Sequence, residues 1–102
     1  ARAQVIRDTL AGTVEAKRMW LDTGMALDIS SATRSIRCPV QVIVGDMDRV
    51  ETEAAMRAVF GRILPDAVVR VLPGVGHLSP LEAPDRLAVL LQEFIASLLS
   101  GA

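Results

Sequence analysis

This 102-residue sequence is poor in several residue types on which specialised proteins depend. It has a single cysteine and a single histidine, which excludes both an intrachain disulfide and a structural zinc site made of these residues. Aromatic residues make up only 3% of the chain, and its net charge is −1. A chain with so few stacking side chains and no basic excess is a poor nucleic-acid binder, so we expect no nucleic-acid partner.

Long hydrophobic runs are also missing. No apolar stretch approaches the roughly 20 residues that a membrane-spanning helix needs, so no membrane partner is expected. The sequence shows no signal-peptide pattern, and we therefore expect a cytoplasmic protein. Because the chain begins with Ala1 and not with methionine, we also expect it to be a piece of a longer protein.

What the sequence does contain is typical of a globular α/β protein: 51% of its residues are hydrophobic and 23% are charged. Two short stretches, 40–44 and 67–72, are apolar at almost every position, as expected of parallel strands covered by helices on both sides. Helical periodicity predicts helices at about 52–63 and 84–99. The fold class is therefore α/β, with a βαβα arrangement.

The first third of the chain is expected to be helical. Residues 1–27 have the pattern of one amphipathic helix, weakened at Gly12 and Thr13, and Asp28 is a suitable N-cap for a short helix after it. Cys38 comes just before the first strand, whereas ligands in open α/β sheets bind beyond the carboxyl ends of strands. We therefore interpret Cys38 as a buried structural thiol.

Each predicted strand ends in a turn that contains side chains able to act as an acid or a base. The first strand is followed by Gly-Asp-Met-Asp, which places Asp46 and Asp48 beyond its end, and the second by Leu-Pro-Gly-Val-Gly-His, which ends at His77. The interval between Asp48 and His77 is long enough for a helix and a strand, as a βαβ unit requires. We therefore expect the two side chains to be neighbours in space.

An imidazole can take a proton from a hydroxyl when its other nitrogen is held by an acceptor, and an ionised aspartate is the best acceptor. Asp48 is the better candidate for this acceptor, because Asp46 directly follows the glycine and is better placed to bind the turn backbone. Taken alone, an aspartate in such a loop is more often a turn residue, and a lone histidine is more often structural. Their joint position at two strand ends favours a catalytic acid, Asp48, and a catalytic base, His77.

These residues resemble the C-terminal end of the α/β-hydrolase superfamily. The resemblance covers about two-thirds of the chain and depends on CPVQVIVGDMDRV, LPDA, LPGVGH and EAP in this order, at positions 38–50, 64–67, 72–77 and 82–84. It implies that Asp48 and His77 are the acid and base of a Ser-His-Asp triad. It also implies that residues 1–35 are the end of a helical cap over the active site and that residues 36–102 are the C-terminal portion of the hydrolase core.

The sequence departs from this family at one point, because it contains no GxSxG nucleophile elbow and no oxyanion-hole segment. We therefore expect a C-terminal fragment that is inactive alone and whose parent protein hydrolyses an ester or a related acyl bond of a small molecule. The family also contains dehalogenases, epoxide hydrolases, C–C bond hydrolases, perhydrolases and acyltransferases, and nothing in this sequence separates these classes. The alternative is a non-catalytic α/β interaction module that retains the loops of the family.

Two further expectations concern partners and cofactors. In the resembled fold another strand lies beside strand 40–44, and this chain has no third strand for that edge. We expect the edge to bind the missing N-terminal portion or a second copy of the chain. No cofactor is expected, because the sequence has no metal-ligand cluster and its glycines at 74 and 76 lack the further glycine and helix start of a phosphate-binding loop.

Overall fold

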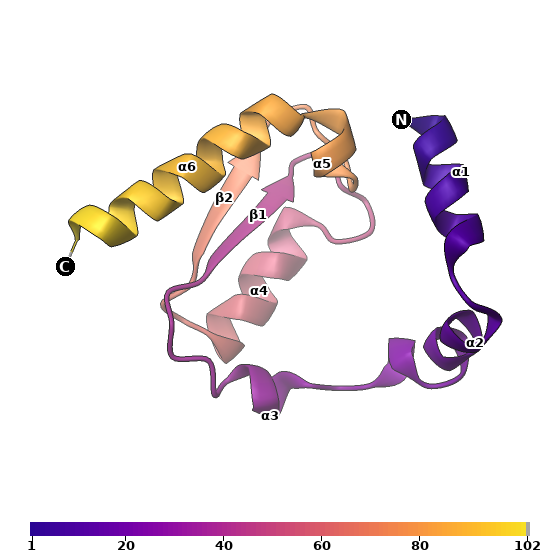
Figure 1. Ribbon diagram of the computed structural model, residues 1–102. Helices are drawn as coiled ribbons and strands as arrows, with labels where there is room; N and C mark the ends of the chain where they lie inside the picture. The colour runs from indigo at the N-terminus through magenta and orange to yellow at the C-terminus, as the bar shows by residue number, and fades with distance from the viewer. Residues whose placement is uncertain (102) are drawn as a thin grey trace.

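The computed structural model describes residues 1–101 (Figure 1). The elements follow in the order α1 (Arg2–Ala11), α2 (Val14–Asp22), the 3-10 helix η1 (Gly24–Ala26), α3 (Ser30–Thr33), β1 (Gln41–Gly45), α4 (Glu53–Ile63), β2 (Val68–Leu72), α5 (Ser79–Glu82) and α6 (Pro84–Ser100). Both predicted strands and both predicted long helices are present, with bounds displaced by no more than one residue. The predicted α/β class is confirmed.

The two strands form a parallel pair, with Gln41 opposite Val68 at one end and Gly45 opposite Leu72 at the other. Helix α4 makes the crossover between them, as a parallel connection requires. Because the strands run in the same direction, their carboxyl ends lie at the same end of the sheet. The loops that follow β1 and β2 therefore leave the sheet side by side.

Helices cover both faces of this small sheet, α6 on one and α4 on the other (Figure 1). Arg70 on β2 pairs with Glu93 on α6 at 3.0 Å, and Ile43 lies opposite Arg70 in the register, so both face α6. The apolar core lies between this face and α6 and consists of Leu72, Val75, Ala83 and Leu90, with Ile43 and Leu87 packed against it. The core thus reaches the loop after β2 and anchors its base.

The outer edge of β1 has no neighbour among residues 1–101, because the sheet described there has two strands. Such an edge presents backbone N–H and C=O groups that can pair with another strand. The open edge expected from the sequence is therefore present, whereas its partner stays a prediction.

The helices before β1 differ from the sequence-based expectation. A single helix over 1–27 was wrong, because the chain turns at Gly12 and Thr13 into two helices. Thr13 has extended backbone angles (φ −71°, ψ 155°), and its side chain accepts a hydrogen bond from the Ala16 N–H at 3.1 Å. Threonine is a strong N-cap in this conformation, so it starts α2 instead of continuing α1. The expectation that Asp28 is the N-cap of the next helix was also wrong: Ile29 is the N-cap of α3, and Asp28, one residue earlier, accepts a hydrogen bond from the Ser30 N–H at 2.9 Å.

The segment formed by α1, α2 and η1 stands to one side of the sheet (Figure 1). It buries no residue, and large apolar side chains such as Leu10 and Leu21 are more than 70% exposed. The assignment of residues 1–35 to a cap stays a prediction. Within residues 1–101, no helix is long and apolar enough to cross a membrane.

Candidate active site

Asp48 and His77 meet at the carboxyl ends of the two strands. Asp48 lies in the turn after Gly45, the last residue of β1, and His77 lies in the loop after Leu72, the last residue of β2. The His77 Nδ1 atom is 2.9 Å from the Asp48 Oδ2 atom. The neighbourhood that we predicted for these two side chains is therefore present.

The Asp48 carboxylate is fixed by its own turn. Its Oδ1 atom accepts hydrogen bonds from the backbone N–H groups of Val50, at 2.8 Å, and Glu51, at 2.9 Å. This leaves Oδ2 free to face His77. The Asp48 side chain is only 6% exposed, so it is held by protein groups with little competition from water.

His77 combines one held nitrogen with one free nitrogen. Because the Asp48 carboxylate can only accept, Nδ1 donates its hydrogen to Oδ2, and a neutral imidazole then has its lone pair on Nε2. Nε2 has no hydrogen-bond partner among residues 1–101, and the His77 side chain is 47% exposed. The imidazole is thus arranged to take a proton from a group that approaches from outside.

The loops that carry the two residues are in direct backbone contact. The Met47 N–H donates to the Val75 carbonyl oxygen at 2.9 Å, and a Cβ atom on Gly45 would lie 2.1 Å from that same oxygen. Gly45 is therefore needed for this close approach. Gly74 has a φ of +72°, which suits the turn between β2 and His77. The glycines bring the loops together, and the loops bring the acid to the base.

Asp46 has a different task from Asp48. Its Oδ1 atom accepts a hydrogen bond from the Gly74 N–H at 2.7 Å, so the prediction that Asp46 binds the backbone of its own turn was wrong: it binds the backbone of the neighbouring loop. The structure therefore brings Asp48, and not Asp46, to His77.

The sequence did not reveal the role of Glu82. Its spacing from Ser79 predicts a capping box, yet the Ser79 side chain makes no capping hydrogen bond. Glu82 instead accepts hydrogen bonds from the N–H groups of Gly76, at 2.9 Å, and Leu78, at 3.0 Å. The carboxylate thereby binds the backbone N–H groups of the residues before and after His77.

The pKa of Asp48 is lowered from its ordinary value of 3.8. Burial acts to raise this pKa, because it disfavours the charged carboxylate. The hydrogen bonds from Glu51, His77 and Val50, together with the charge of a protonated His77, outweigh burial. The site therefore favours the ionised acid that the His77 imidazole needs.

We expect the free energy of unfolding to decrease as the pH falls through the folded-state pKa of Asp48, which lies below 3.8. A carboxyl with a lowered folded-state pKa contributes stability that is present above its unfolded pKa and is lost below the folded one. Urea denaturation between about pH 5 and pH 3 should show this loss, and Asp48→Asn should remove part of it.

Asp28→Asn is the matched control for this measurement. The pKa of Asp28 is also lowered, chiefly by its hydrogen bonds with Ser30. Asp28→Asn should therefore remove the part of the acid-dependent loss of stability that comes from Asp28 and leave the part that comes from Asp48. An acid dependence that Asp48→Asn leaves unchanged would contradict the observed hydrogen bonding of Asp48.

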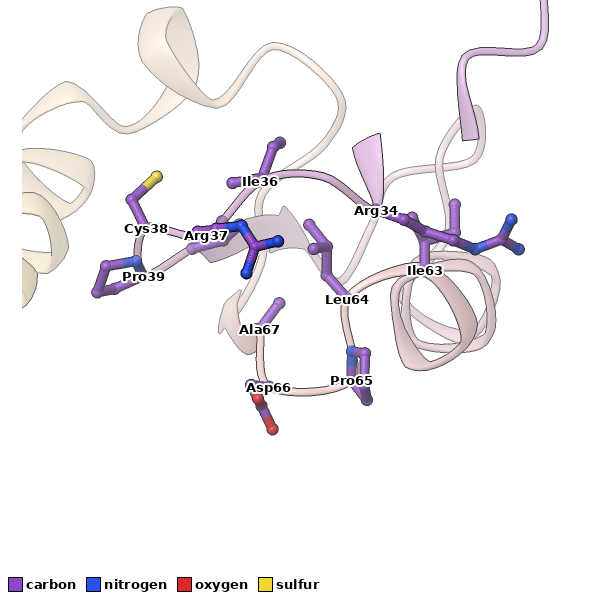
Figure 2. Close-up of a pocket in the computed structure, with 11 residues that line it drawn as sticks. Arg34, Ile36, Arg37, Cys38, Pro39, Ile63, Leu64, Pro65, Asp66 and Ala67 are labelled. Atoms are coloured by element: carbon purple, nitrogen blue, oxygen red, sulfur yellow. The ribbon is translucent and has the colours of Figure 1, made fainter. Parts of the chain in front are cut away.

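A cavity of about 490 Å³ opens at the amino ends of the strands, between the chain that enters β1 and the turn from α4 to β2 (Figure 2). Its lining includes Arg34, Arg37, Cys38 and Asp66. These residues precede the strands, whereas ligands in open parallel sheets bind beyond the strand carboxyl ends. The prediction that Cys38 is buried was wrong: Cys38 is exposed, because it lies at this open end of the sheet.

Among residues 1–101, no group of three or more histidine, cysteine, aspartate or glutamate side chains is arranged to hold a metal ion.

Comparison with known proteins relates this arrangement to two solved structures. No protein-family model and no curated protein matches the chain. The crystal structure of E-2-(acetamidomethylene)succinate hydrolase matches 72% of this chain with a TM-score of 0.64 and 27% identity. MGS-MChE2, an α/β hydrolase from the metagenome of sediments from the lagoon of Mar Chica, Morocco, matches 93% of it with a TM-score of 0.61 and 22% identity.

The matched region is only a part of each of these proteins: the chain spans 27% of the first and 44% of the second. The chain itself has the small parallel sheet and the helices predicted from the sequence, as expected of a portion of such a fold. The resemblance on which the predicted fold was based is thereby confirmed, and the chain is a portion of an α/β-hydrolase fold.

Proposed function

We propose that Asp48 and His77 are the acid and base of a catalytic triad that hydrolyses an ester or a related acyl bond of a small molecule. The observation that carries this proposal is the 2.9 Å contact between Nδ1 and Oδ2, made at the carboxyl ends of adjacent parallel strands. Open α/β sheets bind ligands beyond these carboxyl ends of their strands.

In this mechanism each residue acts through a named atom. Asp48 Oδ2 holds the Nδ1–H of His77, so that Nε2 can accept the proton of a nucleophilic hydroxyl as it attacks the acyl carbon. Nε2 then returns the proton to the leaving group as the scissile bond breaks, and Asp48 stabilises the imidazolium in between. Water attacks the resulting acyl-enzyme in the same way: Nε2 takes a proton from the water and returns it to the oxygen of the nucleophile as the acid product leaves. The nucleophile and the oxyanion donors would come from residues outside this sequence, which has no GxSxG elbow.

The structural neighbours support this reaction class. One of them is named for the hydrolysis of E-2-(acetamidomethylene)succinate, and the other is named an α/β hydrolase. The chain spans less than half of either protein. The activity of the whole protein is therefore part of the proposal, and the geometry of the Asp48–His77 pair is its main support.

A second candidate function is a non-catalytic interaction module. The observation that favours it is the open edge of β1 together with the exposed apolar side chains of α1 and α2, which offer a surface to another chain. The open reading frame that contains this sequence separates the two functions. A preceding strand, GxSxG elbow and helix would support the hydrolase, and a frame without them would overturn it.

We expect no saturable turnover of p-nitrophenyl acetate by the isolated chain beyond the slow attack that any exposed imidazole makes on this activated ester, because a base and an acid without a hydroxyl nucleophile or oxyanion donors lack the machinery for efficient acyl transfer. Turnover should appear only when a nucleophile-bearing portion is supplied.

Light scattering on the same sample should show species larger than a monomer, because the β1 edge is open.

Saturable turnover by the isolated chain that is lost in His77→Ala would show that the chain has its own nucleophile. A stable monomer at high concentration would instead favour a self-sufficient small domain.

A further inference from the structure

Glu82 lies directly beside the loop that carries His77. Its Oε1 atom accepts the Gly76 N–H at 2.9 Å, and its Oε2 atom accepts the Leu78 N–H at 3.0 Å. One carboxylate therefore binds the backbone N–H groups of the two residues that flank His77. Hydrogen bonds to a charged acceptor are among the stronger ones in proteins, so this clamp restricts the backbone from which the imidazole projects.

The other half of the same loop is held from β1. The Gly74 N–H donates to Asp46, and the Val75 carbonyl oxygen accepts from the Met47 N–H. The Val75–Gly76 peptide is thus held at its carbonyl by Met47 and at its N–H by Glu82, whereas the His77–Leu78 peptide is held at its N–H by Glu82. Glu82 thus completes a set of anchors that runs along the whole loop.

Glu82 is attached to the apolar core through its neighbour in the chain. It is the last residue of the single-turn helix α5, and the next residue, Ala83, is buried in the core with Val75 and Leu90. The Ala83 N–H donates to the Ser79 carbonyl oxygen and closes this turn. The carboxylate is therefore supplied by a segment that is attached to the core at Ala83.

The carboxylate also packs against the face of Gly76. A Cβ atom on Gly76 would lie 3.1 Å from both oxygens of Glu82, which is close enough to displace them by a few tenths of an ångström. Position 76 therefore offers a way to disturb the clamp without removing its charge.

We propose that Glu82 is a positioning residue that holds the His77 imidazole against Asp48 through the loop backbone. This role rests on the proposed function of the Asp48–His77 pair. Glu82 makes no hydrogen bond to the His77 ring among residues 1–101, so it acts through the peptide groups at 76 and 78. A small displacement of a catalytic group is costly, which is why such anchoring matters.

The chain is well suited to a direct test, because His77 is its only histidine. Chain labelled with ¹⁵N-histidine gives one imidazole, whose nitrogen shifts report the fraction with the proton on Nδ1. We expect Glu82→Ala to lower this fraction by about twofold or more, because an imidazole freed from a single acceptor samples both tautomers. Glu82→Gln, which keeps one accepting oxygen, should have an intermediate effect.

Two further variants keep the test decisive. Gly76→Ala should shift the tautomer in the same direction as Glu82→Gln while retaining the carboxylate, and it serves if Glu82→Ala fails to fold. Glu93→Gln makes the same chemical change at an exposed pair with Arg70 and should leave the tautomer unchanged. Amide-signal dispersion in each spectrum reports whether the variant is folded.

Asp48→Asn distinguishes the possible failures. If this variant leaves the His77 tautomer unchanged, the pair itself does not form and the proposed function fails. If Asp48→Asn changes the tautomer but folded Glu82→Ala and Gly76→Ala do not, the positioning role of Glu82 alone is overturned.

Discussion

Replacing His77 with alanine in the full-length hydrolase that we propose is expected to lower kcat/KM for an acyl ester by about 10⁴-fold or more. The variant removes the Nε2 atom that would carry the proton between nucleophile and leaving group, and no second histidine exists in this chain to replace it. Steady-state kinetics with p-nitrophenyl acetate would measure the loss. Because His77 is half exposed, the substitution should leave the fold intact.

The two aspartates of the turn after β1 provide the matched comparison for this result. Asp48→Asn should lower kcat/KM by about 10³- to 10⁴-fold, because an amide in place of the carboxylate no longer favours the proton on Nδ1. Asp46→Asn should have a much smaller effect, since its side chain accepts a hydrogen bond from the Gly74 N–H and makes none to His77. A larger loss from Asp46→Asn than from Asp48→Asn would mean that Asp48 is not the acid of the site.

The part of the fold that could be predicted from the sequence is the part with strong local patterns. The strands β1 and β2 are short apolar runs that end in glycine turns, and α6 repeats apolar residues at helical spacing. The meeting of Asp48 and His77 follows from topology, because parallel strands joined by one crossover bring their carboxyl ends together. The sequence pattern therefore determined both the strands and the neighbours at their ends.

The features that the sequence did not reveal depend on contacts between distant segments or on local competition. At Thr13, an N-cap hydrogen bond outcompeted the continuous apolar periodicity of residues 1–27. Cys38 is exposed because no described element covers the amino end of the sheet there. The clamp by Glu82 depends on where α5 places its last residue relative to the His77 loop, and capping-box spacing contains no information on that placement.

Gly45→Ala is expected to destabilise the chain by about 3 kcal/mol and to separate the two loops of the site. The added Cβ atom would lie 2.1 Å from the Val75 carbonyl oxygen and 2.6 Å from that of Gly76, and both are backbone atoms that no change of rotamer can move aside. The loop that carries His77 must shift as a whole, which weakens the Met47–Val75 hydrogen bond. Urea denaturation would measure the destabilisation, and the ¹⁵N shifts of His77 would measure the separation.

Gly61→Ala is the matched control, because it adds the same methyl group at a glycine with no heavy atom within 4 Å of the new Cβ. Gly61 lies inside helix α4, where alanine is favoured over glycine by up to about 1 kcal/mol, so this variant should be neutral or stabilising. A chain with Gly45→Ala that keeps both its stability and its His77 tautomer would show that the two loops are not in the contact described. Loss of stability with an unchanged tautomer would show instead that the Asp48–His77 pair tolerates movement of its loops, which would weaken the role proposed for the Glu82 clamp.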